Sequence, residues 1–157
     1  MRNSKEMLDM AQAYADLKST CIKVKVGSVI ETLPKDGLRE VVFGCNHGVC
    51  DCKTNGCRRK KLYGEASKAH RLPSDCDSIH SEIDAISRAA RQGAALEGAT
   101  IWVTRYPCEA CARAIKAAGI HTVIYGRKEA VSEYTKQILE GLDLIHADDW
   151  DREDNNE

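Results

Sequence analysis

The apolar residues near the start of the chain recur at the spacing of one helix face. They are Met7, Met10, Ala11, Tyr14 and Leu17. Asn3, followed three residues later by Glu6, is typical of a capped helix start. Residues 22–31 then alternate well enough for a strand, residues 34–37 form a turn, and residues 38–44 return as a second strand. This part of the chain therefore predicts a helix followed by a β-hairpin.

From residue 80 onward, helical and strand-like segments alternate. Helices are predicted at about 80–92, 108–118 and 130–140, and strands at 99–104, 121–126 and 142–146. A glycine stands at the end of each helix, namely Gly93, Gly119 and Gly141. Alternation of this kind after a hairpin predicts an α/β fold, in which a mixed sheet carries helices on both faces.

Residues 45–78 show no sustained periodicity. A structureless loop of about 20 residues or more is unusual inside a compact domain. The segment is therefore either disordered or held in place by a staple, that is, by a link between its own side chains. It holds five of the eight cysteines together with His47 and His70, which favours a staple. The acidic residues 148–157 are expected to form a disordered tail. We therefore expect a single domain over residues 1–147 with a Cys-rich insertion at about 45–78.

Composition narrows the class of protein. The chain has 157 residues, of which 43% are hydrophobic and 30% charged, as in a soluble globular domain. No run approaches the roughly 18 apolar residues of a membrane span, and the first residues lack the apolar core of a signal peptide, so we expect a cytoplasmic protein without a membrane partner. A net charge of −1 and 5% aromatic residues argue against a nucleic-acid partner. The run RRKK at 58–61 is the densest positive segment; such runs are usually solvated, although in a nucleotide enzyme this one could lie near a phosphate.

Four residues at predicted helix starts carry the candidate chemistry. His80 opens one helix, and Cys108 and Cys111 share a face of another, directly after Pro107. In a reducing compartment, cysteines are more often metal ligands or catalytic groups than disulfides. One imidazole and two thiolates suit zinc, and three protein ligands leave the fourth position open, as in catalytic sites. We therefore expect His80, Cys108 and Cys111 to hold a catalytic zinc.

Glu82 is the candidate catalytic residue of such a site. Two positions after His80, it points to a different side of the helix, where it can reach water instead of the metal. A carboxylate there can take a proton from water and pass it to a leaving amine. H-x-E alone occurs by chance in many helices, and C-x-x-C alone can be structural or redox-active. Their combination at two helix starts favours catalysis, with Glu82 as the proton shuttle.

The motifs HSE (80–82) and PCEAC (107–111) resemble the H-x-E and P-C-x-x-C signature of zinc deaminases. From about residue 14 to 146 the chain is similar to the cytidine deaminase superfamily, and within it to the deoxycytidylate (dCMP) deaminases. STCIKVKVGSVI (19–30) and GCNHG (44–48) also resemble segments of that family. The resemblance implies a three-layer α/β/α sandwich around a five-stranded mixed sheet. It also implies zinc-dependent hydrolysis of dCMP to dUMP and ammonia.

The resemblance also assigns substrate-binding roles. Asn46 would contact the nucleotide sugar, and Tyr106 would help to wall the base pocket. The chain departs from the family pattern at three positions: Cys45 replaces the usual Tyr, His47 replaces the usual Gly, and Asp84 stands where Asn is frequent. The first two departures concern the nucleotide-binding loop, and none of the three concerns the zinc ligands.

A second set of cysteines lies outside the catalytic motifs. Core packing would account for Cys21 and Cys45, but Cys52 and Cys57 lie in a polar stretch without apolar neighbours. Some dCMP deaminases carry a second, structural zinc in this insertion, and the resemblance implies one here. The matching ligands are Cys21, Cys52, Cys57 and Cys76, with His70 and Cys50 as alternatives.

Other functions remain open, and the family suggests regulation. The alternatives are a base deaminase acting on tRNA or single-stranded DNA, a deaminase of a modified cytosine nucleotide or of a pterin or flavin precursor, and a zinc-stapled binding module without catalysis.

The resemblance implies a homo-hexamer activated by dCTP, with magnesium as a possible companion of the effector, and inhibited by dTTP. Arg91, in the last turn of the helix that begins near His80, is the expected contact for an effector phosphate. The helix dipole alone would also favour an arginine there.

Overall fold

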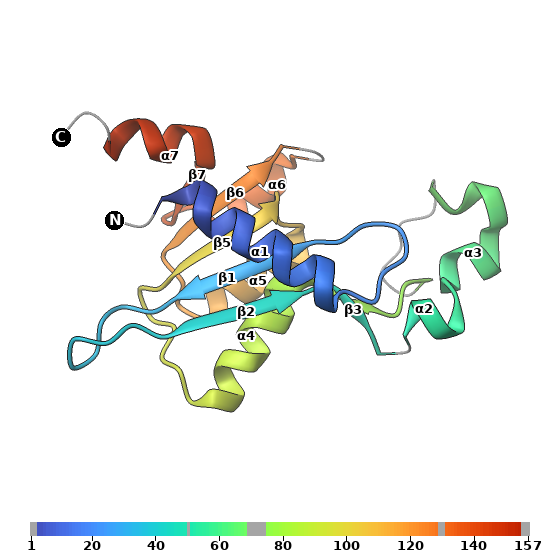
Figure 1. Ribbon diagram of the computed structural model, residues 1–157. Helices are drawn as coiled ribbons and strands as arrows, with labels where there is room; N and C mark the ends of the chain where they lie inside the picture. Colours follow the sequence, from blue (N-terminus) through green and yellow to red (C-terminus); the bar gives the residue numbers. More distant parts are fainter. Residues whose placement is uncertain (1–2, 50, 69–74, 129–130, 155–157) are drawn as a thin grey trace.

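The computed structural model describes residues 3–49, 51–68, 75–128 and 131–154. Its centre is one five-stranded sheet in the order β2-β1-β5-β6-β7 (Figure 1). The strands are β1 (Gly27–Glu31), β2 (Val41–Cys45), β5 (Thr100–Arg105), β6 (Thr122–Arg127) and β7 (Asp143–His146). Strand β1 is antiparallel to β2 and β5, whereas β5, β6 and β7 are parallel. The predicted five-stranded mixed sheet is therefore confirmed.

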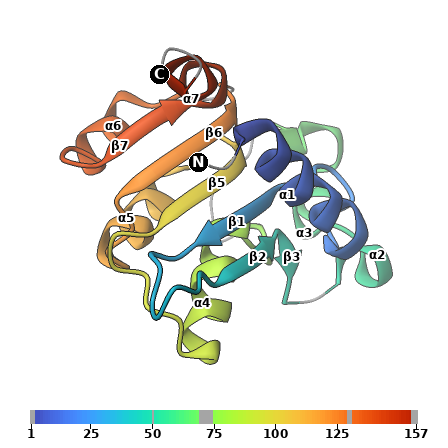
Figure 2. The ribbon, with the colours of Figure 1, turned by 60° about the vertical axis from the view of Figure 1, so that its left-hand side comes forward.

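Helices cover both faces of this sheet (Figures 1 and 2). On one face, α1 (Ser4–Lys18) packs on β1, β2 and β5, and α7 (Ala147–Asp154) packs beside it on β6 and β7. On the other face, α4 (Ser81–Gln92) packs on β1 and β2 and contacts α5 (Glu109–Ala117), which in turn contacts α6 (Glu133–Ile138). The arrangement is the three-layer sandwich expected from the sequence.

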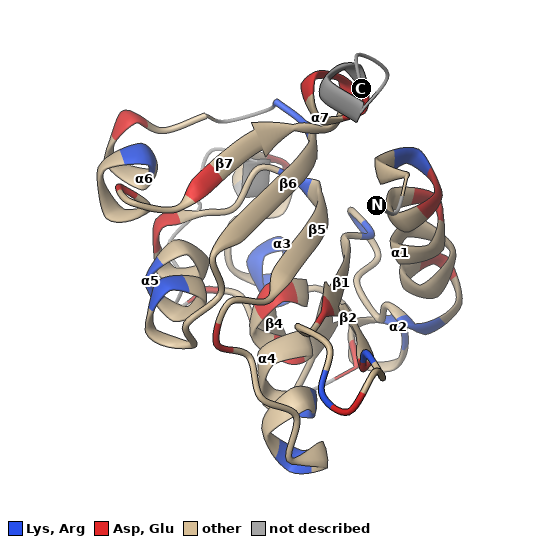
Figure 3. Ribbon diagram, turned by 90° about the vertical axis from the view of Figure 1, so that its left-hand side faces the viewer, with Lys and Arg blue, Asp and Glu red and all other residues tan. Residues whose placement is uncertain are grey.

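A separate hydrophobic cluster fills the space on each side of the sheet. The cluster under α4 and α5 includes Ile30, Val42, Ile101, Ile115 and Val123. The cluster under α1 includes Met7, Val29, Trp102 and Ile124. Successive residues of β1 and β5 thus enter opposite clusters, because side chains alternate across a strand. Charged residues lie mainly on the helices and loops, and the strands are largely free of them (Figure 3).

The capping signals in the sequence correspond to real helix ends. The side chain of Asn3 accepts a hydrogen bond from the backbone of Glu6 at 3.2 Å, as predicted for the start of α1. Gly93 ends α4 in the left-handed conformation, with φ 74°, which glycine adopts without strain. Strand β1 is shorter than the predicted 22–31, because the side chain of Asn46 binds the backbone N–H of Val26 in place of a neighbouring strand.

The Cys-rich insertion contains short elements that lie to one side of the sandwich (Figure 1). Strand β3 (His47–Gly48) pairs with β4 (Ser78–Ile79) at the base of the insertion. Between them lie α2 (Cys52–Asn55), α3 (Arg58–Tyr63) and the 3-10 helix η1 (Gly64–Lys68). Asp51 caps α2 by accepting a hydrogen bond from the backbone of Lys53 at 2.8 Å. The two histidine and cysteine alternatives named for this segment, His70 and Cys50, lie outside the described residues.

The C-terminal segment differs from its prediction. Residues 148–157 were expected to be disordered, but α7 is helical over Ala147–Asp154. The half-buried Trp150 packs against the cluster under α1, and Asp151 accepts a hydrogen bond from the backbone of Ser4 at 3.0 Å. These two contacts join α7 to the cluster under α1 and to the first residue of α1. In the described part of the chain, no helix combines the length and the hydrophobicity that crossing a bilayer requires.

Candidate active site

The three predicted zinc ligands meet where α4 and α5 begin. His80 immediately precedes α4, Cys108 immediately precedes α5, and Cys111 lies in the first turn of α5. The Nδ1 atom of His80 lies 3.4 Å from the Sγ atom of Cys108 and 3.4 Å from that of Cys111. Among the described residues, these form the one group of three or more His, Cys, Asp or Glu side chains whose ligand atoms all lie within 4.8 Å of one another.

This set of donors fits a catalytic zinc. Tetrahedral bonds of about 2.0–2.1 Å to nitrogen and about 2.3 Å to sulfur place the two ligand atoms roughly 3.6 Å apart. The observed separations of 3.4 Å are close to that value. Three protein donors leave one tetrahedral position for water or substrate. The N-terminus of α5 adds a positive dipole end that favours the thiolate form of Cys108 and Cys111.

The three ligands also affect the protonation of one another. Hydrogen bonds from Cys111 and His80 lower the pKa of the Cys108 thiol, although burial acts in the opposite direction. The hydrogen bond to Cys108 raises the pKa of His80, and the hydrogen bond to Cys108 together with burial raises the pKa of Cys111. The lowered pKa of Cys108 favours its thiolate form, which is the form that binds a metal ion.

The carboxylate of Glu82 is buried beside these ligands. Glu82 is 4% exposed and lines the same cavity of about 520 Å³ as His80 and Cys108. Ser81 Oγ donates a hydrogen bond to Glu82 Oε2 at 3.1 Å and also lies 2.7 Å from Ser28 Oγ. Burial raises the pKa of Glu82. A buried carboxylate with a raised pKa is suited to accept a proton and return it.

Asn46 lines the cavity, but most of its side-chain amide is engaged by the protein. Its Oδ1 accepts hydrogen bonds from the backbone of Val26 and the hydroxyl of Ser19, each at 2.8 Å. Its Nδ2 donates to the backbone carbonyl of Val24 at 2.8 Å. These bonds hold the residues directly before β1 against Asn46, which directly follows β2. One Nδ2 hydrogen is left, which is the group that a contact to a sugar oxygen would need.

Tyr106 forms part of the cavity wall, as its predicted role requires. It is 6% exposed and packs edge-on against Tyr125, with ring centroids 4.9 Å apart. Burial raises the pKa of Tyr106. Its buried hydroxyl has no hydrogen-bond partner among the described residues. The ring therefore offers the cavity an apolar surface and a polar atom that the protein leaves unused.

The three departures from the family pattern form one network of hydrogen bonds. Asp84 Oδ1 lies 3.0 Å from Nε2 of His47, and Asp84 Oδ2 accepts hydrogen bonds from the backbone N–H of Cys45 at 3.1 Å and from Nε of Arg88 at 3.0 Å. Arg88 in turn lies over the ring of Tyr14, 5.9 Å from its centroid. Sequence reasoning noted these departures separately and missed their connection. The network ties the loop that contains Asn46 to the helix that contains Glu82.

The cysteines predicted to hold a second zinc approach one another without forming a compact ligand set. Cys21, Cys52, Cys57 and Cys76 all line the 520 Å³ cavity. Burial raises the pKa of Cys52, and the nearby Cys21, Cys57 and Cys76 raise it further. These four are not among the groups whose ligand atoms lie within 4.8 Å of one another in the described part of the chain. The fold thus gathers the set in one region, and the zinc itself stays a prediction.

Arg91 lies apart from this region. It occupies the last turn of α4, is exposed, and is not among the described residues that line the cavity. The opposite end of the same helix begins at His80. Its predicted role as an effector contact remains untested.

Three cationic residues that sequence reasoning did not assign to the site also line the cavity. They are Lys23, Arg59 and Arg105. Arg59 is close enough to His80 for its positive charge to act against the rise in the pKa of that imidazole. The run RRKK was a signal for Arg59, whereas nothing in the sequence pattern distinguished Arg105, at the end of β5.

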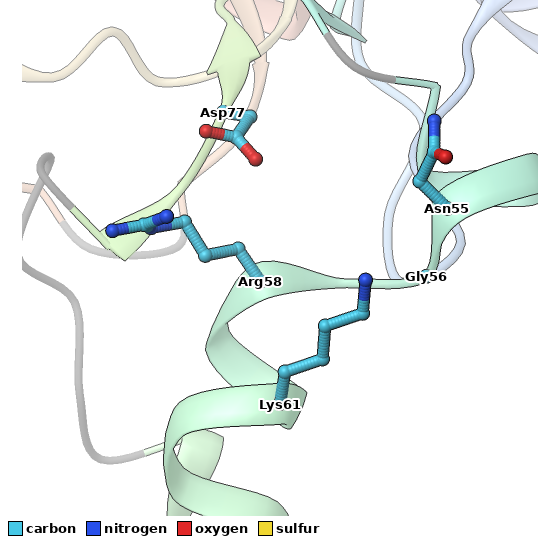
Figure 4. Close-up of a pocket in the computed structure, with 5 residues that line it drawn as sticks. All are labelled: Asn55, Gly56, Arg58, Lys61 and Asp77. Atoms are coloured by element: carbon cyan, nitrogen blue, oxygen red, sulfur yellow. The ribbon is translucent and has the colours of Figure 1, made fainter.

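The neighbouring Arg58 faces a different hollow. Arg58 and Lys61 on α3, with Asn55, Gly56 and Asp77, line a space of about 280 Å³ (Figure 4). None of these residues lines the cavity that contains Glu82. The consecutive residues Arg58 and Arg59 therefore line two different cavities.

Comparison with known proteins agrees with this geometry. The family model of the cytidine and deoxycytidylate deaminase zinc-binding region matches residues 1–127. The chain belongs to this family. The match includes all three candidate zinc ligands and Glu82.

Two groups of relatives are similar to the chain. It is 31% identical over 136 residues to ComE operon protein 2 of Bacillus subtilis (strain 168), covering 83% of this chain and 64% of that protein. It is 32% identical over 122 residues to the deoxycytidylate deaminase of Mycobacterium phage D29, covering 77% of this chain and 91% of that enzyme. The match to the deoxycytidylate deaminase of Enterobacteria phage T4 is 46% identical over 64 residues and covers 33% of that enzyme. The chain thus spans less than two thirds of the Bacillus and T4 proteins.

Solved structures of other deaminases share the fold of the chain. The dCMP deaminase of cyanophage S-TIM5 in complex with dCMP and dUMP has a TM-score of 0.67 at 20% sequence identity, covering 93% of this chain and 98% of that one. A diaminohydroxyphosphoribosylaminopyrimidine deaminase/reductase of Thermotoga maritima has a TM-score of 0.60 at 22% identity, covering 98% of this chain and 38% of that one. At these identities the likeness concerns the arrangement of sheet and helices.

Proposed function

We propose that the protein deaminates dCMP to dUMP and ammonia with a zinc ion bound by His80, Cys108 and Cys111. The observation that carries the proposal is the buried carboxylate of Glu82, which lines the same cavity as His80 and Cys108. A structural zinc site has no need of such a group, because four protein ligands complete it. Membership of the deaminase family and the likeness to deoxycytidylate deaminases support dCMP as the substrate.

Different residues of the chain have different roles in the proposed reaction. Bound zinc would supply a Lewis acid that lowers the pKa of water. Glu82 takes one proton from the water as the water oxygen bonds to C4 of the cytosine ring, and passes that proton to the ring nitrogen N3. It then takes the second proton of the same water and passes it to the amino group, which leaves as ammonia when the bond between C4 and the amino nitrogen breaks. Ser81 orients the Glu82 carboxylate by its hydrogen bond to Oε2. Tyr106 and Asn46 wall the space for base and sugar.

The test distinguishes the proton-transfer role of Glu82 from the metal-binding role of Cys108. Glu82→Gln is expected to keep zinc near its wild-type content while ammonia release from dCMP falls by roughly 10²–10⁴-fold or more. Cys108→Ala is expected to lose both zinc and activity, because it removes a ligand. Zinc is measured by elemental analysis and turnover by ammonia release. Near-normal turnover by Glu82→Gln would show that another group transfers the proton.

Substrate identity needs its own panel. Purified protein is offered dCMP, deoxycytidine, dCTP, methylated and hydroxymethylated dCMP, a single-stranded oligodeoxynucleotide and a tRNA anticodon stem. The proposal requires dCMP to have the highest kcat/KM among the unmodified substrates. Faster turnover of tRNA or oligonucleotide would replace it with base deamination of nucleic acids, and bound zinc without turnover of any substrate would favour a binding module.

We also propose a second zinc in the Cys-rich insertion, held by Cys21, Cys52, Cys57 and Cys76. Support comes from their position around one region and from the effect of the other three on the pKa of Cys52. Tetrahedral binding needs the four sulfur atoms roughly 3.8 Å apart, so the metal would draw them closer together. Two zinc ions per chain in elemental analysis, falling to one in Cys57→Ala, are the expected result. One zinc in fully active wild-type protein would contradict it.

Regulation and assembly are proposals of the same kind. We propose a cytoplasmic homo-hexamer in which dCTP, accompanied by magnesium, lowers the half-saturating dCMP concentration and dTTP raises it. Arg91 is exposed, as an effector contact between subunits would need. Saturation curves with and without each triphosphate and magnesium test the effectors, and sedimentation tests the hexamer. Superimposable curves for the wild type, or equal responses in Arg91→Glu, would reject the role of Arg91.

A further inference from the structure

Asn46 is attached to helix α4 through both of its neighbours in the chain. The backbone N–H of Cys45 donates a hydrogen bond to Oδ2 of Asp84 at 3.1 Å, and Nε2 of His47 lies 3.0 Å from Oδ1 of the same carboxylate. Because a carboxylate only accepts hydrogen bonds, the ring N–H of His47 is the donor. One side chain of α4 thus holds the residues on either side of Asn46.

These two bonds set the position of Asn46 relative to Glu82. Asp84 lies in the first turn of α4, two positions after Glu82, and its carboxylate is 7% exposed and also bonded to Nε of Arg88 at 3.0 Å. The hydrogen bonds of the Asn46 side chain go to residues 19–26, before β1, and so do not attach it to α4. Without Asp84, Asn46 and the segment before β1 could therefore move together relative to Glu82.

Asn46 lines the cavity that contains Glu82, whereas His47 and Asp84 do not. The described part of the chain uses one of the two Nδ2 hydrogens of Asn46, for the backbone carbonyl of Val24 at 2.8 Å. The second hydrogen is available to a ligand in the cavity. The deoxyribose of dCMP has one hydroxyl group, on C3′, and an amide N–H can donate to a hydroxyl oxygen. An effect of His47 on the sugar therefore acts through Asn46.

We propose that His47 and Asp84 are positioning residues, which hold the N–H of Asn46 in place for the 3′-hydroxyl of the substrate. This inference rests on the proposed function and adds the residues that align the sugar. Hydrogen bonds weaken steeply when the donor angle is poor, so a small shift of the Asn46 amide would lose the contact. The family pattern usually has glycine at position 47, and glycine has no side chain that could donate to residue 84. The bridge is therefore a feature of this chain.

The contribution of the 3′-hydroxyl can be measured with two substrates. 2′,3′-Dideoxycytidine monophosphate (ddCMP) lacks this hydroxyl and is otherwise identical to dCMP. The ratio of kcat/KM for dCMP to that for ddCMP therefore isolates the hydrogen bond, which is expected to contribute about fivefold. A general weakening of the fold or of the metal site would lower kcat/KM for both compounds alike and leave the ratio unchanged.

The experiment compares the ratio in wild type, His47→Ala, His47→Gln and the matched control His121→Ala, at equal zinc content. We expect His47→Ala to lower the ratio about fivefold. His47→Gln keeps an N–H donor near the place of Nε2 and should retain most of the wild-type ratio. His121 also faces an aspartate, with Nε2 3.6 Å from Oδ2 of Asp143, but it is exposed and does not line the cavity, so His121→Ala should leave the ratio unchanged.

Two further variants test the route of the effect. Asp84→Ala removes the acceptor for both neighbours of Asn46 and, measured well below its Tm, should lower the ratio at least as far as His47→Ala. Asn46→Ala removes the donor to the sugar, so adding His47→Ala to it should lower the ratio no further. Should Asn46→Ala fold poorly, the comparison of His47→Ala with His47→Gln still decides the question.

The outcomes also separate this inference from the proposed function. Active His47→Ala protein with the wild-type ratio would overturn the inference and leave the function standing. A wild-type ratio near one would do the same, because the 3′-hydroxyl would then contribute nothing. A further fall when His47→Ala is added to Asn46→Ala would show that His47 does not act through Asn46. Wild-type protein that deaminates neither compound would reject the proposed function and this inference with it.

Discussion

Replacing Asp84 by alanine removes the acceptor that three donors share. The side chain of Asp84 is 7% exposed and receives hydrogen bonds at 3.0–3.1 Å from Cys45, His47 and Arg88. The backbone N–H of Cys45 is buried and would stay unsatisfied, at a cost of about 1–3 kcal/mol. His47 and Arg88 are 28% and 34% exposed, so water can replace their partner at a cost of about 0.5–1 kcal/mol each.

The total loss for Asp84→Ala is therefore about 2–5 kcal/mol of unfolding free energy. In a domain of this size that corresponds to a fall in Tm of roughly 4–20 °C. The assay is thermal unfolding followed by circular dichroism, with zinc content matched between samples because a bound metal adds its own stabilisation. Asp84→Asn keeps one carbonyl oxygen as an acceptor and should lose about half as much.

Asp9→Ala is the matched control. Asp9 and Lys5 form a shorter ion pair of 2.7 Å, but their side chains are 66% and 79% exposed. Such exposed pairs contribute little to stability, because water and salt screen the two charges, so Tm should fall by no more than roughly 2 °C. Burial and the number of donors, and not the length of the ion pair, would then decide the size of the effect. Equal Tm values for Asp84→Ala and Asp9→Ala at equal zinc content would refute this reasoning.

Three further outcomes are expected. Gly44→Ala should lower both Tm and dCMP turnover, because a methyl group there would overlap the backbone of Ser81 and Ala85 in α4; wild-type values for both would show that α4 can shift freely. Trp150→Ala should cost about 2 kcal/mol in urea denaturation, since a half-buried indole leaves the cluster under α1; no change would mean that α7 is not docked in solution. Removal of metal by a chelator should abolish dCMP turnover, and added zinc, but not magnesium, should restore it; recovery with magnesium would contradict the Cys108 and Cys111 ligand assignment.

The sequence predicted the scaffold well because its signals were local. Asn3 marked the start of a helix and Gly93 marked the end of another, and both act through hydrogen bonds within a few residues. The candidate zinc ligands were predictable for the same reason, since each motif sits at a helix start. The five-stranded mixed sheet was expected from the family resemblance, whereas the strand order β2-β1-β5-β6-β7 was not predicted, because pairing between distant strands leaves little trace in local periodicity.

The missed features depend on contacts between distant residues. Asp84 and His47 are 37 positions apart, so their bond could not be read from either segment. Arg105 enters the cavity only because β5 ends beside the insertion. Trp150 was hidden in an acidic segment, and its docking depends on a surface formed mainly by α1 and the sheet. In each case one side chain matters, and an average over a window of residues conceals it.

The separation of the insertion from both hydrophobic clusters has an evolutionary consequence. Neither cluster includes a described residue from positions 46–78, yet that segment supplies Arg59 and part of the cavity wall. Substitutions there can alter which ligands enter without removing an apolar contact that holds the sandwich together. The candidate zinc ligands and Glu82, by contrast, lie at the starts of α4 and α5, and both helices contribute residues to the cluster against the sheet. Mutations in the insertion can therefore change the wall of the cavity while the sandwich and the candidate metal site stay in place.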